Sequence, residues 1–146
     1  MEKFAEQLNR IIEQNIPLLN EITDQELSYK VNTEKWSKKE ILGHLIDSAE
    51  NNIQRFVRVQ YENEPFIFYE QNEWVRIQYY QNKYSKEEIM TLWRLLNKQI
   101  ITILQNFPVE KQALKCYKNK ELVSITFVIE DYIKHLLHHL EQIINS

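Results

Sequence analysis

The chain has 146 residues, of which 43% are hydrophobic and 27% charged, with a formal net charge of −3 at pH 7. This length predicts a single domain over residues 1–146, with a core that buries about two thirds of the unfolded chain's surface. The weak negative charge argues against nucleic acid as a partner, because nucleic-acid-binding proteins present a basic patch. Cys116 is the one cysteine, which excludes an intrachain disulfide framework and any multi-cysteine metal cluster.

The sequence also indicates where in the cell the protein is expected. No apolar run approaches the ~18 residues of a membrane span, and the N-terminal segment MEKFAEQLNR lacks the apolar region of a signal peptide. We therefore expect a cytoplasmic protein with no membrane partner. One glycine and three prolines indicate long helices, since sheets need more turn residues.

The first predicted helix covers residues 2–21, where apolar side chains recur at helical spacing. Pro17 should bend or restart this helix, because proline lacks the backbone N–H. Thr23 and Glu26 have the spacing of a capping box, in which each residue's side chain accepts a hydrogen bond from the other's backbone N–H. A short helical turn is expected there.

The second predicted helix covers residues 38–61 and has a clear start. Ser37 and Glu40 form another capping box, and Trp36 can pack on Ile41 just inside the helix. One face of this helix is apolar. A polar strip borders that face and contains His44, Ser48, Asn51, Asn52 and Arg55.

Residues 62–84 form a long connection that is rich in aromatic side chains, and Pro65 marks its beginning. We expect a helical turn near Trp74. The aromatic side chains could anchor the connection to the helices, line a substrate cleft or form a dimer interface.

The third predicted helix begins at the capping box of Ser85 and Glu88 and ends near Gln105. A second connection, residues 106–123, separates it from the last helix. Ser124 or Thr126 caps this fourth helix, which is expected to continue to about residue 144.

Three of the four histidines lie in the fourth predicted helix. His135 and His139 are four residues apart, so they lie on the same face and can direct two imidazoles at one atom. At about 100° of rotation per residue, both lie at the edge of the apolar stripe, while His138 points away from it.

Four amphipathic helices predict an all-α four-helix bundle. His44 is early in the second helix, whereas His135 and His139 are late in the fourth, so the three meet only if these helices are antiparallel. An up-down-down-up bundle satisfies this condition and needs a long crossover between helices two and three. Residues 62–84 are long enough, because a 24-residue helix spans roughly 36 Å and extended chain covers up to ~3.3 Å per residue.

Three neutral imidazoles suit zinc, nickel, iron or copper. Three protein ligands leave a coordination position open, which is typical of catalytic metal sites. Asp131 and Asp47 each lie one turn from a histidine of the set and could orient its ring. The alternative is that the histidines are ordinary packed or solvated side chains.

The order and spacing of these motifs resemble the DinB-like (YfiT-like) superfamily over nearly the whole chain. The matching segments are Trp36-Ser37, the run from Glu40 to Asp47, Asn51-Asn52, Arg55-Phe56 and the run from Asp131 to Ile143. This resemblance implies an up-down-down-up bundle that holds a divalent metal (zinc, nickel or iron) on His44, His135 and His139. It also implies that homodimers are a frequent assembly.

The resemblance implies several functions for a small-molecule substrate. The first is a thiol-dependent S-transferase that uses bacillithiol or a similar low-molecular-weight thiol. Among the residues themselves, Arg55 or the aromatic connection could hold the cofactor, and Asn52 is a further candidate for contact with the metal ligands or the substrate. The second is a metal-dependent hydrolase, which needs a carboxylate near the metal as proton acceptor. The third is a non-catalytic metal-binding protein of the stress response. An open cleft at the histidines would favour chemistry, and a sealed site would favour a structural role.

Overall fold

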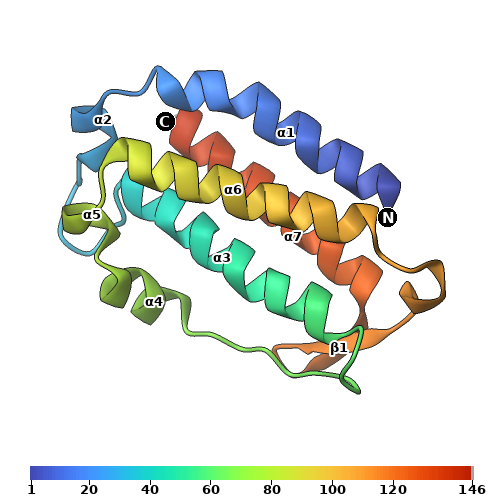
Figure 1. Cartoon of the computed structure of the whole chain (residues 1–146). Coiled ribbons are helices and arrows are strands. Elements are labelled where there is room, and N and C mark those ends of the chain that lie inside the picture. Colours follow the sequence, from blue (N-terminus) through green and yellow to red (C-terminus); the bar gives the residue numbers. More distant parts are fainter. Residues whose placement is uncertain (146) are drawn as a thin grey trace.

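The computed structural model describes residues 1–145 and confirms the predicted four-helix bundle (Figure 1). The long helices are α1 (Glu2–Asn20), α3 (Lys38–Arg58), α6 (Lys86–Gln105) and α7 (Ile125–Ile144). Shorter helical segments are α2 (Asp24–Ser28), α4 (Gln71–Gln78), α5 (Tyr80–Lys83) and the 3₁₀ helix η1 (Val109–Lys111). None of the helices in this part of the chain is both long and apolar enough to cross a membrane.

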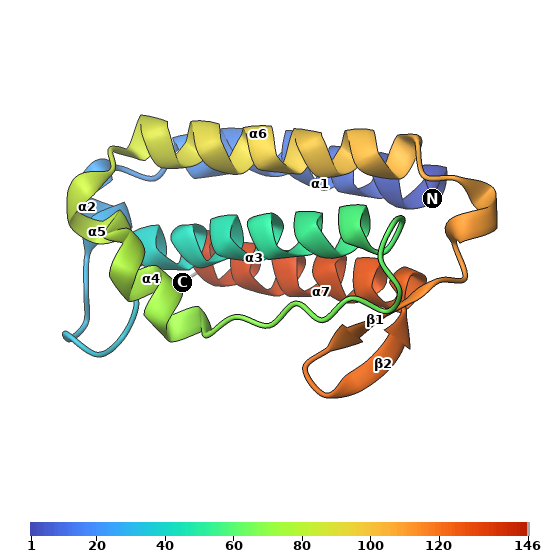
Figure 2. The ribbon, with the colours of Figure 1, turned by 60° about the horizontal axis from the view of Figure 1, so that its bottom comes forward.

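The directions of the long helices determine which residues meet. Figure 1 shows α1 and α7 running one way and α3 and α6 running the other, so the chain order is up, down, down, up. Figure 2 shows two layers, with α1 and α6 in one and α3 and α7 in the other. Both α1 and α3 pack against α6 and α7. Because α3 and α7 are antiparallel neighbours, the start of α3 lies beside the end of α7.

Local side-chain chemistry sets the helix starts. Thr23, Ser37 and Ser85 each complete the predicted capping box with the glutamate three residues later. Ser124 caps α7 by accepting a hydrogen bond from the backbone N–H of Phe127. Of the two candidate caps of the last helix, Ser124 and Thr126, the structure uses Ser124.

Helix ends were predicted less well. Pro17 does not restart α1, which continues to Asn20, and the buried Leu19 packs its last turn against the core. The α3 helix ends at Arg58, three residues before its expected end. The side chain of Gln60 donates a hydrogen bond to the carbonyl of Phe56 and so satisfies a backbone acceptor where the helix stops.

The two connections contain more structure than expected. The segment near Trp74 is helical, as predicted, but extends over α4 and α5. Residues 106–123 were predicted only as a connection, and they include most of an antiparallel hairpin of β1 (Lys115–Lys118) and β2 (Glu121–Ser124). Asn119 turns the hairpin with φ of 57°, a left-handed conformation that asparagine tolerates better than most residues.

The hairpin is tied to the first connection. The backbone N–H of Tyr117 donates to the carbonyl of Pro65 at 3.0 Å, and Phe66 forms a parallel bridge with Tyr117. Cys116 on β1 is fully buried, and burial raises the pKa of its thiol, so it is a protonated core residue. The connection and the hairpin together cover the outer side of α3 and α7 (Figure 2).

Candidate metal centre

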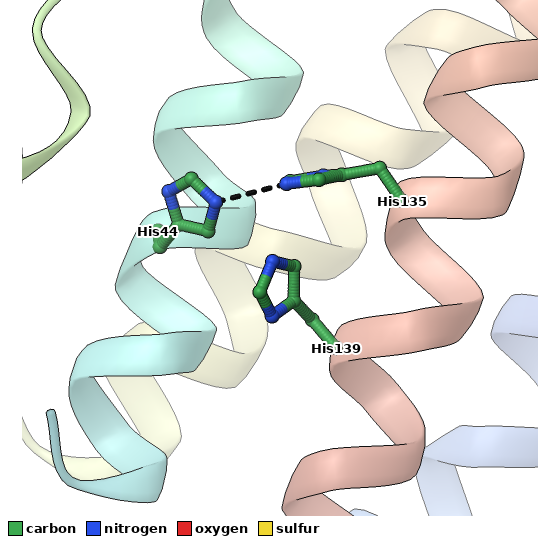
Figure 3. Close-up of side chains that lie close together, drawn as sticks. All are labelled: His44, His135 and His139. Atoms are coloured by element: carbon green, nitrogen blue, oxygen red, sulfur yellow. Dashed lines mark hydrogen bonds between the residues drawn. The ribbon is translucent and has the colours of Figure 1, made fainter.

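Three histidines converge between the start of α3 and the end of α7. His44 comes from the second turn of α3, and His135 and His139 come from successive turns of α7 (Figure 3). The Nε2 atoms of His44 and His135 are 2.9 Å apart. One ligand nitrogen from each ring lies within 4.8 Å of the other two. The antiparallel packing of α3 and α7 therefore brings together residues that are 91 positions apart in the chain.

Burial keeps these imidazoles neutral. The side chain of His44 is 1% exposed, and those of His135 and His139 are partly buried. Burial lowers the pKa of His44 to about 3 and that of His135 to about 4, and neighbouring imidazoles add to both shifts. Burial also lowers the pKa of His139. At neutral pH each ring therefore keeps a nitrogen lone pair, which a metal ligand requires.

The tautomer of His139 follows from its hydrogen bond. Its Nδ1 lies 2.8 Å from Oε1 of Gln142, which is an acceptor, so Nδ1 carries the proton and Nε2 keeps the lone pair. Nδ1 of His44 is buried and has no hydrogen-bond partner. The ring of Trp36 packs against His44, with centroids 5.0 Å apart. His138 is exposed and stands outside the cluster, as predicted from its angular position.

The donor set fits a divalent transition-metal cation. Imidazole nitrogens bind zinc at about 2.0–2.1 Å, so nitrogens within a few ångströms of one another can share one ion. The Nε2 atoms of His44 and His135 face each other at 2.9 Å, and two nitrogen lone pairs repel at this distance unless a proton or a cation lies between them. This geometry therefore fits a shared metal ion. No carboxylate of residues 1–145 joins the cluster, so a bound ion would keep its full positive charge.

Asp47 has other partners in this structure. Its Oδ1 accepts hydrogen bonds from the hydroxyl of Tyr80 at 2.6 Å and from the amide of Gln78 at 3.2 Å. Its Oδ2 is buried without a partner, and burial raises the pKa of this carboxyl to about 6. The ring of Tyr80 packs directly over Gly43, the residue before His44. Asp47 thus fastens α4 and α5 onto α3 beside the histidines.

A cavity of about 340 Å³ adjoins the histidines. It lies between α3 and α7 under the first connection and is open to solvent. Its lining residues are Ser48, Asn52, Arg55, Phe68, Tyr69, Glu70, Gln71, Lys118, Asn119, Asp131, Tyr132 and His135. We call it the α3–α7 cavity. One of the three candidate ligands therefore faces a space in which a small molecule can be held.

The remaining predicted site residues lie along this cavity. Asn52 and Arg55 line it from α3, and the guanidinium of Arg55 donates to Oδ1 of Asn52 at 3.1 Å. Asp131 lines it from α7, but its carboxylate accepts a hydrogen bond from Lys118 on β1 and does not bond to His135. The structure thus places Asn52, Arg55 and Asp131 in the cavity wall and gives Asp131 a partner other than the expected one.

The sequence analysis missed two residues of the site. Lys118 was not predicted, because the segment that carries it was assigned only as a connection and no hairpin was expected there. Gln142 was quoted only within the family pattern, although its spacing of three from His139 on one helix indicates a neighbour. Tyr69 belonged to the aromatic connection, and its position in the cavity wall supports the expectation that this connection lines a cleft. Tyr80 instead anchors the connection to the core.

Fold and site together define a class of protein: an up-down-down-up four-helix bundle with a three-histidine cluster between antiparallel helices at one end. The family model of the DinB superfamily matches residues 7–143, and the chain belongs to this superfamily. No curated protein matches the sequence.

Solved structures agree with this assignment. YfiT from Bacillus subtilis, described as a probable metal-dependent hydrolase with an unusual four-helix bundle topology, has a TM-score of 0.79 and 20% identity. The match covers 99% of this chain and 81% of YfiT. Two structures of the mycothiol-dependent maleylpyruvate isomerase, one of them a mutant, have TM-scores of 0.77 with 10% and 12% identity. The match covers 96% of this chain but only 59% of those proteins. At these identities the likeness shows the fold alone.

Proposed function

We propose that this protein is a metal-dependent enzyme that transfers a low-molecular-weight thiol onto an electrophilic small molecule. The observation that carries the proposal is the convergence of three neutral imidazoles, one of which, His135, lines a solvent-reached cavity. A divalent cation held there would supply Lewis acidity and lower the pKa of a thiol that approaches it. Zinc, nickel and iron all suit such a donor set.

The residues of the chain have separate roles in this proposal. His44, His135 and His139 hold the cation, and Gln142 keeps the proton of His139 on Nδ1. The polar wall of α3 binds the body of the thiol. In the reaction the sulfur forms a bond to an electrophilic carbon, the leaving group departs with its electron pair, and the thiol proton passes to solvent. Positioning the two reactants together in one cavity is the main contribution of the protein.

Hydrolysis is the second candidate, because YfiT is described as a probable hydrolase. This reaction needs a carboxylate near the metal to accept the proton of water. The carboxylates in the cavity wall are those of Glu70 and Asp131, and Asp131 is engaged by Lys118. Thiol transfer has no need of this acceptor and is the better supported of the two. A purely structural metal is disfavoured because the cavity opens to solvent beside His135.

The experiment measures metal content and transfer activity in the same samples. Purified protein should contain one divalent cation per chain and should conjugate bacillithiol to chlorodinitrobenzene. The His139→Ala variant should lose more than about 100-fold in metal affinity, since even residues that only orient a ligand are worth 10–100-fold. It should lose transfer activity to a similar degree. Chelation followed by metal return should remove and restore the rate.

The matched control is His138→Ala, which removes an exposed imidazole one residue away. This variant should keep both metal and activity. Transfer that is equally fast in His139→Ala and wild type would overturn the proposal. Cleavage of an ester or amide substrate by the metal-loaded protein without any thiol would instead establish the hydrolase.

A further inference from the structure

Arg55 is a buried cation whose partners are all neutral. Its side chain is 5% exposed. One terminal nitrogen donates to Oδ1 of Asn52 at 3.1 Å and the other donates to the carbonyl of Ile67 at 2.8 Å. Its Nε is buried and has no partner. A buried charge is costly unless an opposite charge compensates it, and neither of these hydrogen bonds of Arg55 goes to a carboxylate.

The surroundings of Arg55 do not provide that compensation. Lys118 also lines the cavity. Burial lowers the pKa of Lys118 and the charge of Arg55 adds to that shift, so the two cations repel each other. Asp131 is paired with Lys118. Glu70 lies in the cavity wall but is exposed to solvent, where water screens its charge. The guanidinium is thus held in place by two neutral acceptors, which engage one N–H of each terminal nitrogen, while its Nε–H has no partner.

We propose that Arg55 forms an anion subsite in the α3–α7 cavity that binds a carboxylate of the ligand through the guanidinium N–H groups that have no protein partner, Nε–H among them. The backbone carbonyl of Ile67 and the side chain of Asn52 fix the guanidinium plane by one bond to each terminal nitrogen. The Nε–H and the second N–H of each terminal nitrogen are then the candidate donors for an incoming oxygen. Assigning this carboxylate to the thiol or the electrophile rests on the proposed function, whereas carboxylate binding itself does not.

The position of this subsite limits the size of the ligand. Eleven residues separate His44 from Arg55 on α3, which is about 16 Å along the helix axis. The long side chain of Arg55 reaches back one turn to Asn52, which shortens this span. A ligand that reaches from the histidines to Arg55 must therefore be extended, with its carboxylate several bonds from the reacting atom. The cavity volume of about 340 Å³ is within the range of small-molecule sites.

Arg55 also joins α3 to the first connection, so a purely structural role is the competing explanation. The two roles differ in a direct observation on the wild-type protein. Succinate added to metal-free protein should shift the ¹⁵N–¹H signal of the Arg55 Nε–H group, assigned through its bonds. Neutral succinamide, which has the same carbon chain, should leave that signal in place. If succinate leaves the signal unmoved, the subsite does not exist.

Variants then measure the contribution of the guanidinium. Arg55→Gln should weaken succinate binding at least about tenfold in calorimetry, because a charge-assisted hydrogen bond is lost. Arg58→Gln is the matched control. Arg58 lies one turn further on α3 and pairs with Glu62 away from the cavity, so this variant should bind succinate like wild type. If Arg55→Gln fails to fold, Arg55→Lys replaces it and should still weaken binding, because lysine has no Nε–H group.

The same titration separates this proposal from the proposed function. If Arg55→Gln binds succinate as tightly as wild type and differs only in thermal stability, Arg55 has a purely structural role and the subsite is overturned. Binding that requires added metal and is unchanged by Arg55→Gln would place the carboxylate on the cation and overturn it as well. A protein without thiol-transferase activity would still show the Nε–H shift, so the two failures are distinguishable.

Discussion

Replacing Gly43 with alanine should destabilise the protein, although alanine is the better helix former. A Cβ atom at this position would lie 2.5 Å from Cγ and 2.8 Å from Cε2 of Tyr80, and closer still to Cδ2. These separations are too short for carbon atoms, so the ring must move. The ring of Tyr80 is 1% exposed and its hydroxyl donates to Asp47 at 2.6 Å, so it has little room to move without losing that bond.

The magnitude follows from three contributions. Alanine gains about 1 kcal/mol over glycine in helix propensity. Overpacking a tight core costs about 1–3 kcal/mol, and a weakened bond that leaves buried Asp47 without its donor costs about 1–3 kcal/mol more. The net loss is about 3 kcal/mol, which for a domain of this size lowers Tm by about 6–12 °C.

The assay is chemical denaturation of metal-free protein, with the midpoint and slope fitted for each variant. The matched test is the same substitution in a Tyr80→Leu background. Without the ring, Gly43→Ala should become neutral or stabilising by up to about 1 kcal/mol, so its sign changes between the two backgrounds. Stabilisation by Gly43→Ala in the wild-type background would show that the glycine is not required by the ring, and the reasoning would be refuted.

Two further predictions follow from the buried groups and the helix caps. Metal-free protein should lose roughly 2–3 kcal/mol of stability between pH 7 and pH 5. The pKa of His44 and His135 falls from about 6.5 in the unfolded chain to about 3 and about 4 when folded, so acid favours the unfolded state by about 2 kcal/mol for each. Asp47, whose pKa is raised to about 6, opposes this loss by about 1.4 kcal/mol, so the Asp47→Asn variant should lose more stability in acid than wild type. Urea denaturation at each pH measures the free energy of unfolding, and a stability that does not change with pH would contradict the prediction. Ser85→Ala should cost about 1 kcal/mol through the loss of a helix cap. Ser37→Ala should cost more stability than Ser85→Ala, because the buried Ser37 hydroxyl also donates a hydrogen bond to Gln81. Equal losses of stability in thermal melts of the two variants would show that this second bond contributes nothing.

Much of the fold could be predicted because its signals are local in the chain. Each capping box lies within four residues, so Ser37 and Ser85 mark their helix starts without any tertiary information. The pairing of His135 with His139 is equally local, since helix geometry alone places residues four apart on one face. The place of His44 beside them needed one further step, the length of the connection that allows α3 and α7 to be antiparallel.

Contacts between distant segments could not be predicted in this way. Asp47 and Asp131 are both one turn from a histidine, and the sequence offers no reason to assign them different partners. Tyr80 and Lys118 are the partners that the structure provides, and each arrives from a separate connection. The choice depends on how those connections pack across α3 and α7, which no local pattern encodes.

The sequence by itself therefore determined the four long helices, the capping boxes at Ser37 and Ser85, and the pairing of His135 with His139. Only the tertiary structure decided what surrounds those histidines: the α3–α7 cavity, the hairpin that contributes Lys118, and the neutral contacts of Arg55. The physical reason is that helix formation and i, i+4 pairing act over a few residues. Cavities and charge pairing instead arise where segments far apart in the chain are packed together, and their geometry is set by the whole core.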